Sequence, residues 1–450
     1  MIKLTLAVIL LVAATVPAAL MPGQARIDTG IDVGAKEVRM AFPEFQARSN
    51  DPALLKYTAL FNQVLWDDLD YSGSIALVSR SFYPLGKFQS PTDIRVEEWT
   101  KPGVNAQYMV FGASDLAGGR LRFESRLWDL AVVQNRELIA KVYTSSALTD
   151  DAVRLTAHTL ADEIVDKLFG GRMGVARTQI AYVAATGNNN KEIYLMDYDG
   201  SNPGPLTVYR STTIMPNWAP DGERLAFVTT RRNYWNIEVM SRLDRRTVEF
   251  PKPAGTTGTP AWSPDASQVA YSTHTSDGTT EIYVADWNGR NPKRLTVTPK
   301  GTINISPTWS KTGQQIAFVS DRSGTQQIYT MDAEGTNVQR LIDEGGDAEN
   351  PAWSPDGQFI AFAWKKRNSG RYDIYIHDLA RGRNSQLTSD AGDNERPSWA
   401  PDSRHIVFAS TRTGRSQIYS MLAGGQNPRL RQLTKTGSNE GPAWSSFIGK

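Results

Sequence analysis

The sequence predicts an α/β domain followed by an all-β six-bladed β-propeller that its C-terminal strand closes. Three observations predict this fold: a tripeptide that recurs six times, short strand-like segments after each copy, and mixed helices and strands before the first. The tripeptide is Pro-x-Trp, and subtraction of residue numbers places its tryptophans 44, 47, 44, 46 and 45 residues apart. A period in the forties built from short strands is typical of propeller blades. The six copies occupy residues 216–218, 260–262, 307–309, 351–353, 397–399 and 442–444.

The unit that begins at Asn350 shows how one blade is built. Pro-Ala-Trp-Ser forms a first short strand, and the tight turn after it has proline at its second position and ends in Gly357. Apolar residues then alternate in the second and third strands. We expect the four strands at residues 351–354, 360–362, 372–378 and 386–388, with a hairpin loop at 365–370. A blade cannot bury both of its faces alone, but stacking around a ring covers them and hides the sheet edges.

The two ends of the repeat region are incomplete in complementary ways. The region opens with a second-strand sequence, Ile180-Ala181-Tyr182-Val183, that no Pro-x-Trp strand precedes. It ends with the first-strand sequence Pro442-Ala443-Trp444-Ser445. We therefore expect the last strand to complete the first blade and lock the ring.

Composition excludes several classes of function. The formal net charge of +2 on 450 residues argues against nucleic acid as the main partner. The chain has no cysteine, so disulfides, thiolate metal sites, a cysteine nucleophile and lipid attachment through an N-terminal cysteine are all excluded. A length of 450 residues predicts at least two domains.

The N-terminus has the pattern of a secretory signal. Residues 1–25 contain Lys3, an apolar run from Leu4 to Val16, and small residues that favour cleavage after Ala25. The alternative is a membrane anchor, but the run is short and Pro17 interrupts it. We expect an exported protein that is peripheral to membranes through its partners only.

Residues 26–35, RIDTGIDVGA, form a glycine-containing polar tail. Two interpretations stay open: a disordered terminus, or a segment that docks on a partner by adding a strand. The residues of the second interpretation are Arg26, Ile27, Asp28, Thr29, Ile31, Asp32 and Val33.

Residues 36–170 predict the α/β domain. Apolar residues at helical spacing predict a helix over 52–69 and another from Thr149 to about Phe169, which Gly170 ends. Ser90 and Pro91 predict the start of a short helix over 91–99. Strands are expected at 37–41, 74–78, 106–112, 120–129 and 138–143, with a linker at 171–177 and the propeller at 178–450.

Six units of the form P-x-W-S-P-D-G, I-A-F and I-Y-x-M-D after a signal peptide and an α/β domain resemble the TolB family, periplasmic propellers of the Tol–Pal system of Gram-negative bacteria. The resemblance covers the whole chain, and it rests on the order of parts because similar single repeats occur in protease propellers. It implies a non-enzymatic scaffold whose propeller mouth binds a Pal-like lipoprotein and whose N-terminal tail binds a TolA-like inner-membrane protein. It also implies a role in outer-membrane integrity and in constriction at cell division.

No catalytic pattern is present in the sequence. It lacks a G-x-S-x-G elbow, and none of His158, His274, His377 and His405 has a metal-like partner at short spacing. Each histidine is therefore interpreted as a core or surface residue, and no cofactor, metal or catalytic residue is expected. The repeated tryptophans are interpreted as packing between blades.

The residues just before each Pro-x-Trp are expected to end a loop and to ring one mouth of the channel. Glu349, Glu395 and Glu440 occupy one position in three consecutive units and form an acidic arc, to which Asp347 and Asp393 add. Three interpretations stay open: a solvated rim, a partner-binding face and a cation site. The expected mouth residues are Thr256, Thr257, Asn304, Ile305, Glu349, Asn350, Glu395, Arg396, Asn439 and Glu440, with Thr257 and Ile305 on a neutral side.

Two functions of different class follow. The first is the scaffold that the resemblance implies. The second is a secreted propeller that binds or processes a small ligand, a glycan or a peptide, in its channel.

Overall fold

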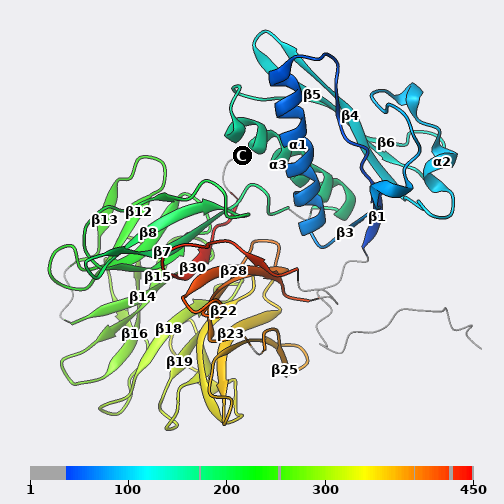
Figure 1. The fold of residues 1–450 in the computed structure, drawn as a ribbon. Helices are drawn as coiled ribbons and strands as arrows, with labels where there is room; N and C mark the ends of the chain where they lie inside the picture. The colour runs from blue at the N-terminus through cyan, green and yellow to red at the C-terminus, as the bar shows by residue number, and fades with distance from the viewer. Residues whose placement is uncertain (1–36, 172–173, 252–254, 390, 425–428, 448–450) are drawn as a thin grey trace, which may run out of the picture.

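The computed structural model describes residues 37–171, 174–251, 255–389, 391–424 and 429–447. It contains a mixed sheet with helices followed by a six-bladed propeller, which confirms the predicted fold class (Figure 1). The expected signal peptide, 1–25, and tail, 26–35, lie outside the described residues. No helix in the described part of the chain combines the length and hydrophobicity needed to cross a membrane.

The N-terminal sheet has the strand order β3-β1-β4-β5-β6, and β2 also pairs with β4. Helices α1 and α3 cover one of its faces, and α2 with the loops beside it covers the other (Figure 1). The elements are β1 (Val38–Ala41), β2 (Gln46–Ala47), α1 (Pro52–Tyr71), β3 (Ile75–Leu77), η1 (Arg80–Phe82), η2 (Pro91–Asp93), α2 (Val96–Thr100), β4 (Tyr108–Ala117), β5 (Arg120–Asp129), β6 (Glu137–Thr144) and α3 (Asp150–Phe169).

Local signals explain most of these bounds. The Thr149 side chain accepts a hydrogen bond from the amide of Ala152 and caps α3 at its start, and Gly170 ends the helix at φ +62°. The single helix expected over 91–99 is instead two short ones, because Ile94 and Arg95 between them have extended backbone. Trp99 still reaches the core and is fully buried.

Each blade is a four-stranded antiparallel sheet whose strands follow one another from the channel outward. Blade 1 contains β30, β7, β8 and β9, and blades 2 to 6 contain β10 to β29 in chain order. The inner strands are β10 (Thr213–Trp218), β14 (Thr257–Trp262), β18 (Asn304–Trp309), β22 (Gly346–Trp353), β26 (Asn394–Trp399) and β30 (Asn439–Trp444). The second strands are β11 (Arg224–Thr229), β15 (Gln268–His274), β19 (Gln315–Ser320), β23 (Phe359–Lys366), β27 (His405–Ser410) and β7 (Gln179–Gly187).

In each blade the fourth strand is shorter than the third. The third strands are β12 (Asn236–Ser241), β16 (Thr280–Asp286), β20 (Gln327–Asp332), β24 (Asp373–Asp378), β28 (Gln417–Leu422) and β8 (Asn190–Asp197). The fourth strands are β13 (Thr247–Glu249), β17 (Lys293–Arg294), β21 (Gln339–Arg340), β25 (Arg383–Gln386), β29 (Arg431–Gln432) and β9 (Gly204–Pro205). The fourth strand expected at 386–388 ends earlier, because the Thr388 hydroxyl turns inward and accepts the amide of Ile374.

The predicted ring closure is confirmed by the pairing of β30 with β7, where Trp444 lies opposite Ile180 (Figure 1). The chain beyond β30 adds two further contacts. The amide of Ser445 donates to the carbonyl of Gln179, and the Ser446 hydroxyl donates to the carbonyl of Pro220 in blade 2. The end of the chain therefore holds blade 1 together and also touches the next blade.

Five of the six repeated tryptophans are buried between blades, and Trp353 is partly exposed. Trp309 and Trp399 donate their indole N–H to a carbonyl of the preceding blade, at 3.2 and 3.0 Å. Trp353 instead donates to Gly357 of its own blade, at 3.4 Å.

Candidate functional site: the mouth of the propeller channel

The inner strands of all six blades surround the channel, and they begin at one end of it, which we call the mouth. Each strand runs from the mouth to its tryptophan at the other end. The second strands begin at that far end, where Arg404 and His405 contact the N-terminal domain. The mouth is therefore the end of the channel that faces away from the N-terminal domain.

A β-bulge interrupts every inner strand just before the proline of Pro-x-Trp. The bulged residue has a positive φ in all six blades, between +48° and +56°. Proline has no amide to donate, so it is tolerated inside a sheet at such a bulge. The six bulged residues are Met215, Thr259, Ser306, Asn350, Arg396 and Gly441.

The bulge corrects one expectation from the sequence. The residues before each Pro-x-Trp were expected to end a loop, but they lie inside the inner strands. There the side chains alternate: the residue three positions before each proline, the first position, is buried in the blade, and the residue two positions before it, the second position, borders the channel. The second residues, each paired with the neighbouring strand, are Ile214, Gly258, Ile305, Glu349, Glu395 and Glu440.

Three of the expected mouth residues are therefore not available to a partner. Thr257, Asn304 and Asn439 occupy first positions, and their exposed fractions are 4, 0 and 5%. Gly258, and not Thr257, is the residue that matches Ile305 on the neutral side. Thr257 lies three residues before Pro260, as Asn304 does before Pro307, so the expected neutral pair of Thr257 and Ile305 joined two positions that are not equivalent.

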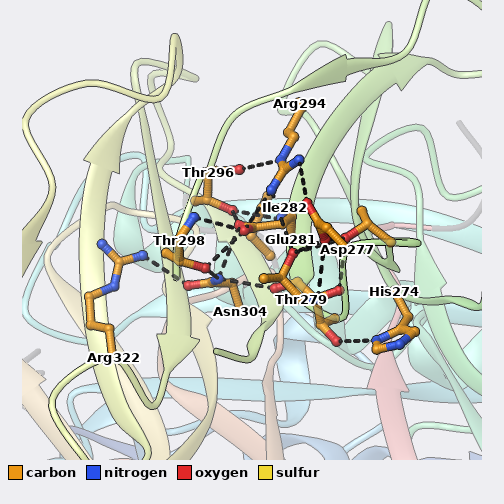
Figure 2. Close-up of polar contacts among 12 residues, drawn as sticks. His274, Asp277, Thr279, Glu281, Ile282, Arg294, Thr296, Thr298, Asn304 and Arg322 are labelled. Carbon is orange, nitrogen blue, oxygen red and sulfur yellow. Dashed lines mark hydrogen bonds and ion pairs between the residues drawn. The ribbon is translucent and has the colours of Figure 1, made fainter. Parts of the chain in front are cut away.

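Asn304 instead joins two blades. Its amide nitrogen donates to the buried carboxylate of Glu281 in blade 3, at 3.1 Å, and to the carbonyl of Thr280, at 3.0 Å. Thr298 and Arg294 also donate to Glu281, at 2.8 and 2.9 Å, as Figure 2 shows. The fully buried charge of Glu281 is in this way paired and hydrogen-bonded, as a buried carboxylate must be.

The same link recurs at two other blade junctions. Asn394 donates to Asp373, and Asn439 donates to Gln417, at 3.1 and 2.9 Å. A threonine of the fourth-strand region joins each pair. The sequence contains a signal for this link: a polar residue stands directly before Ile-Tyr in the third strand, and the next unit supplies the asparagine.

The remaining expected residues line the accessible mouth. Thr256 is exposed, and Ile305, Glu349, Asn350, Glu395, Arg396 and Glu440 are partly exposed. The acidic arc of Glu349, Glu395 and Glu440 occupies blades 5, 6 and 1, which are consecutive in the ring. Ile214, Gly258 and Ile305 form an uncharged arc in blades 2, 3 and 4.

The three carboxylates of the acidic arc have different surroundings. Glu349 accepts the hydroxyl of Tyr372 at 2.7 Å, and Glu440 forms an ion pair with Lys191. Among the described residues no side chain donates a hydrogen bond to Glu395. Burial raises the pKa of Glu395, and the nearby charges of Asp393, Glu349 and Glu440 raise it further, against the opposing effect of Arg396. Of the three carboxylates in the acidic arc, Glu395 is therefore the one whose negative charge is least offset by hydrogen bonds or ion pairs.

Arg396 makes the arc less negative than the sequence suggested. A Cβ atom added to Gly441 would lie 3.2 Å from the Arg396 guanidinium, so the arginine extends across the inner strand of blade 1. The glycine at this bulge leaves the room that the arginine occupies. The mouth thus presents carboxylates and one guanidinium side by side, a pattern that favours a polar, charge-complementary partner.

The described residues offer no group of three or more His, Cys, Asp or Glu placed to hold a metal ion. His377 in β24 contacts Asn384 at 2.8 Å, and His274 lies exposed at the end of β15. His158 and His405 are buried at the junction of the two domains, where their pairing was not foreseen from the sequence.

The chain resembles known proteins in sequence and in structure. The family model of the TolB β-propeller domain matches residues 165–448. The Tol-Pal system protein TolB of Desulfosudis oleivorans is 32% identical over 263 residues, which cover 58% of each chain. The protein TolB homolog of Chlorobium chlorochromatii is 30% identical over 292 residues, which cover 64% of this chain and 62% of the relative.

The matched part of the chain thus spans about 58 to 62% of the length of these curated relatives. The crystal structure of TolB from Acinetobacter baumannii superposes with a TM-score of 0.75 at 22% identity, and the match covers 92% of this chain and 97% of that one. At this identity the superposition supports the fold, including the N-terminal domain. Because the family model covers most of the chain, the protein belongs to the TolB β-propeller family.

Proposed function

We propose that this protein is a non-enzymatic periplasmic scaffold of the Tol–Pal system. In this role the propeller mouth binds a Pal-like peptidoglycan-associated lipoprotein. The N-terminal tail, residues 26–35, binds a TolA-like inner-membrane protein. The scaffold supports outer-membrane integrity and constriction at cell division. The observation that carries the proposal is the match of residues 165–448 to the TolB propeller family.

The geometry of the mouth supports the first partner. The mouth faces away from the N-terminal domain, so a folded partner reaches it without meeting that domain. Its two arcs give a partner one charged side and one uncharged side to recognise. Charge complementarity of this kind raises the rate of association and fixes the orientation of a partner.

Export belongs to the same proposal. Removal of residues 1–25 by cleavage after Ala25 leaves the tail at the new N-terminus, where it is free to add a strand to a partner. Mass spectrometry of the protein purified from the periplasmic fraction tests this step. A mature protein that retains residues 1–25 would contradict it.

The mouth is tested by binding of the mature protein to the Pal lipoprotein of the same organism, measured by calorimetry. We compare the wild type with the triple variant Glu349→Ala, Glu395→Ala and Glu440→Ala. The matched control removes three exposed carboxylates at the far ends of the blades, through Glu223→Ala, Asp244→Ala and Glu334→Ala. We expect the mouth variant to bind at least tenfold more weakly and the control to bind as the wild type does, since truncating central interface residues costs more than about 1 kcal/mol.

The outcomes separate the possible errors. Wild-type binding that the mouth variant retains would refute the acidic arc as the contact. An equal loss in the control variant would show that only net charge matters. A wild type that does not bind the lipoprotein at all would overturn the scaffold role and favour a ligand in the channel.

A further inference from the structure

The C-terminal end of α1 carries a local electrostatic conflict. Its last turn contains Asp67, Asp68 and Asp70 and no basic residue. The C-terminus of a helix has a partial negative charge and carbonyl groups without partners in the helix, so cations and donors stabilise it and carboxylates do not. Ser72 satisfies two of the last carbonyls, those of Asp68 and Leu69, but the helix itself offers no basic side chain to offset the acidic ones.

The propeller adds basic side chains at this end of the helix. Arg404 donates to the carbonyls of Ser72 and Gly73, at 3.1 and 2.7 Å, and Arg431 donates to the carbonyl of Asp67, at 3.1 Å. The guanidinium of Arg431 also lies 3.9 Å above the ring of Tyr71. Basic side chains of blade 6 thus cap a helix of the N-terminal domain, and the cap exists only when the two domains are docked.

His405 also contacts the end of α1, and this contact requires a particular protonation state of its ring. Its side chain is fully buried, its Nδ1 lies 2.6 Å from the carboxylate of Asp402, and its Nε2 lies 2.9 Å from the carbonyl oxygen of Tyr71. A carbonyl oxygen and a carboxylate only accept hydrogen bonds. Both bonds are therefore made at once only when both ring nitrogens carry a proton.

The undocked propeller does not need the second proton. Without α1, a single proton on Nδ1 maintains the bond to Asp402, and Nε2 is free to accept from water. Burial tends to raise the pKa of Asp402, but His405 and two backbone amides hold it below its ordinary value, so the carboxylate stays ionised.

A small cavity of about 20 Å³, enough for one water molecule, adjoins this contact. Asp68, Asp162 and Asp402 line it together with Tyr198, Arg404 and His405. Each of the three carboxylates pairs with one basic side chain: His158 at 2.7 Å, Arg177 at 2.9 Å and His405 at 2.6 Å, in that order. Two of these three partners are histidines, which are positive only when protonated.

His158 differs from His405, because only one of its ring nitrogens has a hydrogen-bond partner among the described residues. Its Nδ1 contacts Asp68, which also accepts the Tyr198 hydroxyl, and its Nε2 has no hydrogen-bond partner among the described residues. One ring proton therefore satisfies His158. Burial alone would lower the pKa of His158, but Asp68 and Asp199 raise it overall, although Arg154 opposes them.

We propose that docking of the N-terminal domain on the propeller is a proton-dependent latch, in which His405 binds the carbonyl of Tyr71 only while both of its ring nitrogens are protonated. The docked state holds about one more proton than the undocked state. Docking is then complete at low pH and weakens as pH rises, by up to about tenfold per pH unit for one proton. The proposal does not depend on which partners the protein binds.

Hydrogen exchange of the mature protein tests the latch, because it detects rare opening even when docking is strong. The readout is the protection of the peptide that covers residues 67–77, measured from pH 6 to pH 9 and corrected for the intrinsic exchange rate. In the wild type we expect protection to fall with rising pH. Protection that is constant across this range would overturn the proposal.

Asp402→Asn separates the latch from a merely structural role. The asparagine oxygen still accepts the backbone amides of Arg404 and His405, and its nitrogen donates to Nδ1 of a neutral His405, whose one proton then sits on Nε2. We expect this variant to stay docked and to lose about one proton from the pH dependence. His405→Gln is expected to weaken protection at every pH.

His377→Gln is the matched control, since His377 is a buried histidine of blade 5 that contacts Asn384 within its own blade. It should keep the wild-type pH dependence at residues 67–77. An Asp402→Asn variant with the full wild-type slope would refute the role of His405 and assign the proton to another group, His158 first.

Discussion

The tryptophans of the inner strands allow a comparison within one molecule. Trp399 has an exposed fraction of 6%, stacks at 6.3 Å on Phe359 and donates its indole N–H to Ala352 of the preceding blade. Trp353, the same residue one blade earlier, is partly exposed and bonds within its own blade. We expect the same substitution to have unequal costs at the two positions.

Trp399→Ala removes a large buried side chain between two blades, which costs about 3–5 kcal/mol. The lost indole hydrogen bond is part of that cost, and Trp399→Phe isolates it at roughly 1 kcal/mol. For a domain of this size each kcal/mol lowers Tm by about 2–4 °C, so Trp399→Ala should lower Tm on the order of 10 °C. Trp353→Ala should cost clearly less, because exposed area contributes little.

Calorimetry of the four proteins, wild type included, is the assay, with far-UV circular dichroism to verify that each variant is folded. Equal losses of Tm at Trp353 and Trp399 would refute the reasoning, because burial would then not set the cost. So would an unchanged Tm in Trp399→Ala, which would remove the tryptophan from the packing between blades.

Three further predictions concern the ring and its mouth. Asn394→Ala should lower the free energy of unfolding by about 1–3 kcal/mol in urea titrations, because it leaves the buried carboxylate of Asp373 without one of its donors; no loss would show that Asp373 is satisfied otherwise. Glu395→Gln should raise Tm near pH 7 and have little effect near pH 4: the folded state raises the pKa of Glu395, so its charge destabilises the fold above that pKa and is absent below it. If Glu395→Gln changes Tm by the same amount at pH 7 and at pH 4, this prediction is wrong. Deletion of residues 438–450 removes β30 and should lower the Tm of the whole propeller rather than fray one end. A truncated protein with the wild-type Tm would refute closure of the ring by β30.

The architecture was predictable because its signals are local and repeated. The Pro-x-Trp period gave the blade count, and the mismatched ends gave the pairing of Trp444 with Ile180. Thr149 and Gly170 gave the bounds of α3. In each case a short stretch of chain carries the physical cause, such as a cap, a turn or an alternation of apolar residues.

The errors at the mouth have a different origin. Thr257 occupies the same position as Asn304, three residues before the proline, and is buried, whereas Gly258 is the residue equivalent to Ile305. Asn304 and Asn439 are polar and directly precede residues that border the channel. Their side chains nevertheless bond to buried groups of the neighbouring blade. The contact between His405 and Tyr71 joins residues 334 positions apart, and a single sequence contains no local pattern for it.

In the inner strands, some positions are buried within the ring and another borders the channel, where a partner can contact it. The residue at the first position and the proline are buried in all six blades, and the tryptophan is buried in all but the blade of Trp353. The second residue pairs through its backbone. At this position Ile214 also packs against two hydrophobic clusters of the ring, Gly258 has no side chain, and Glu395 carries a carboxylate. The same backbone geometry thus holds side chains of different size and charge. The second position is therefore the part of the inner strand where the blades differ most in charge, and in three consecutive blades it carries the carboxylates of the acidic arc, at a cost in stability that the Glu395→Gln variant measures.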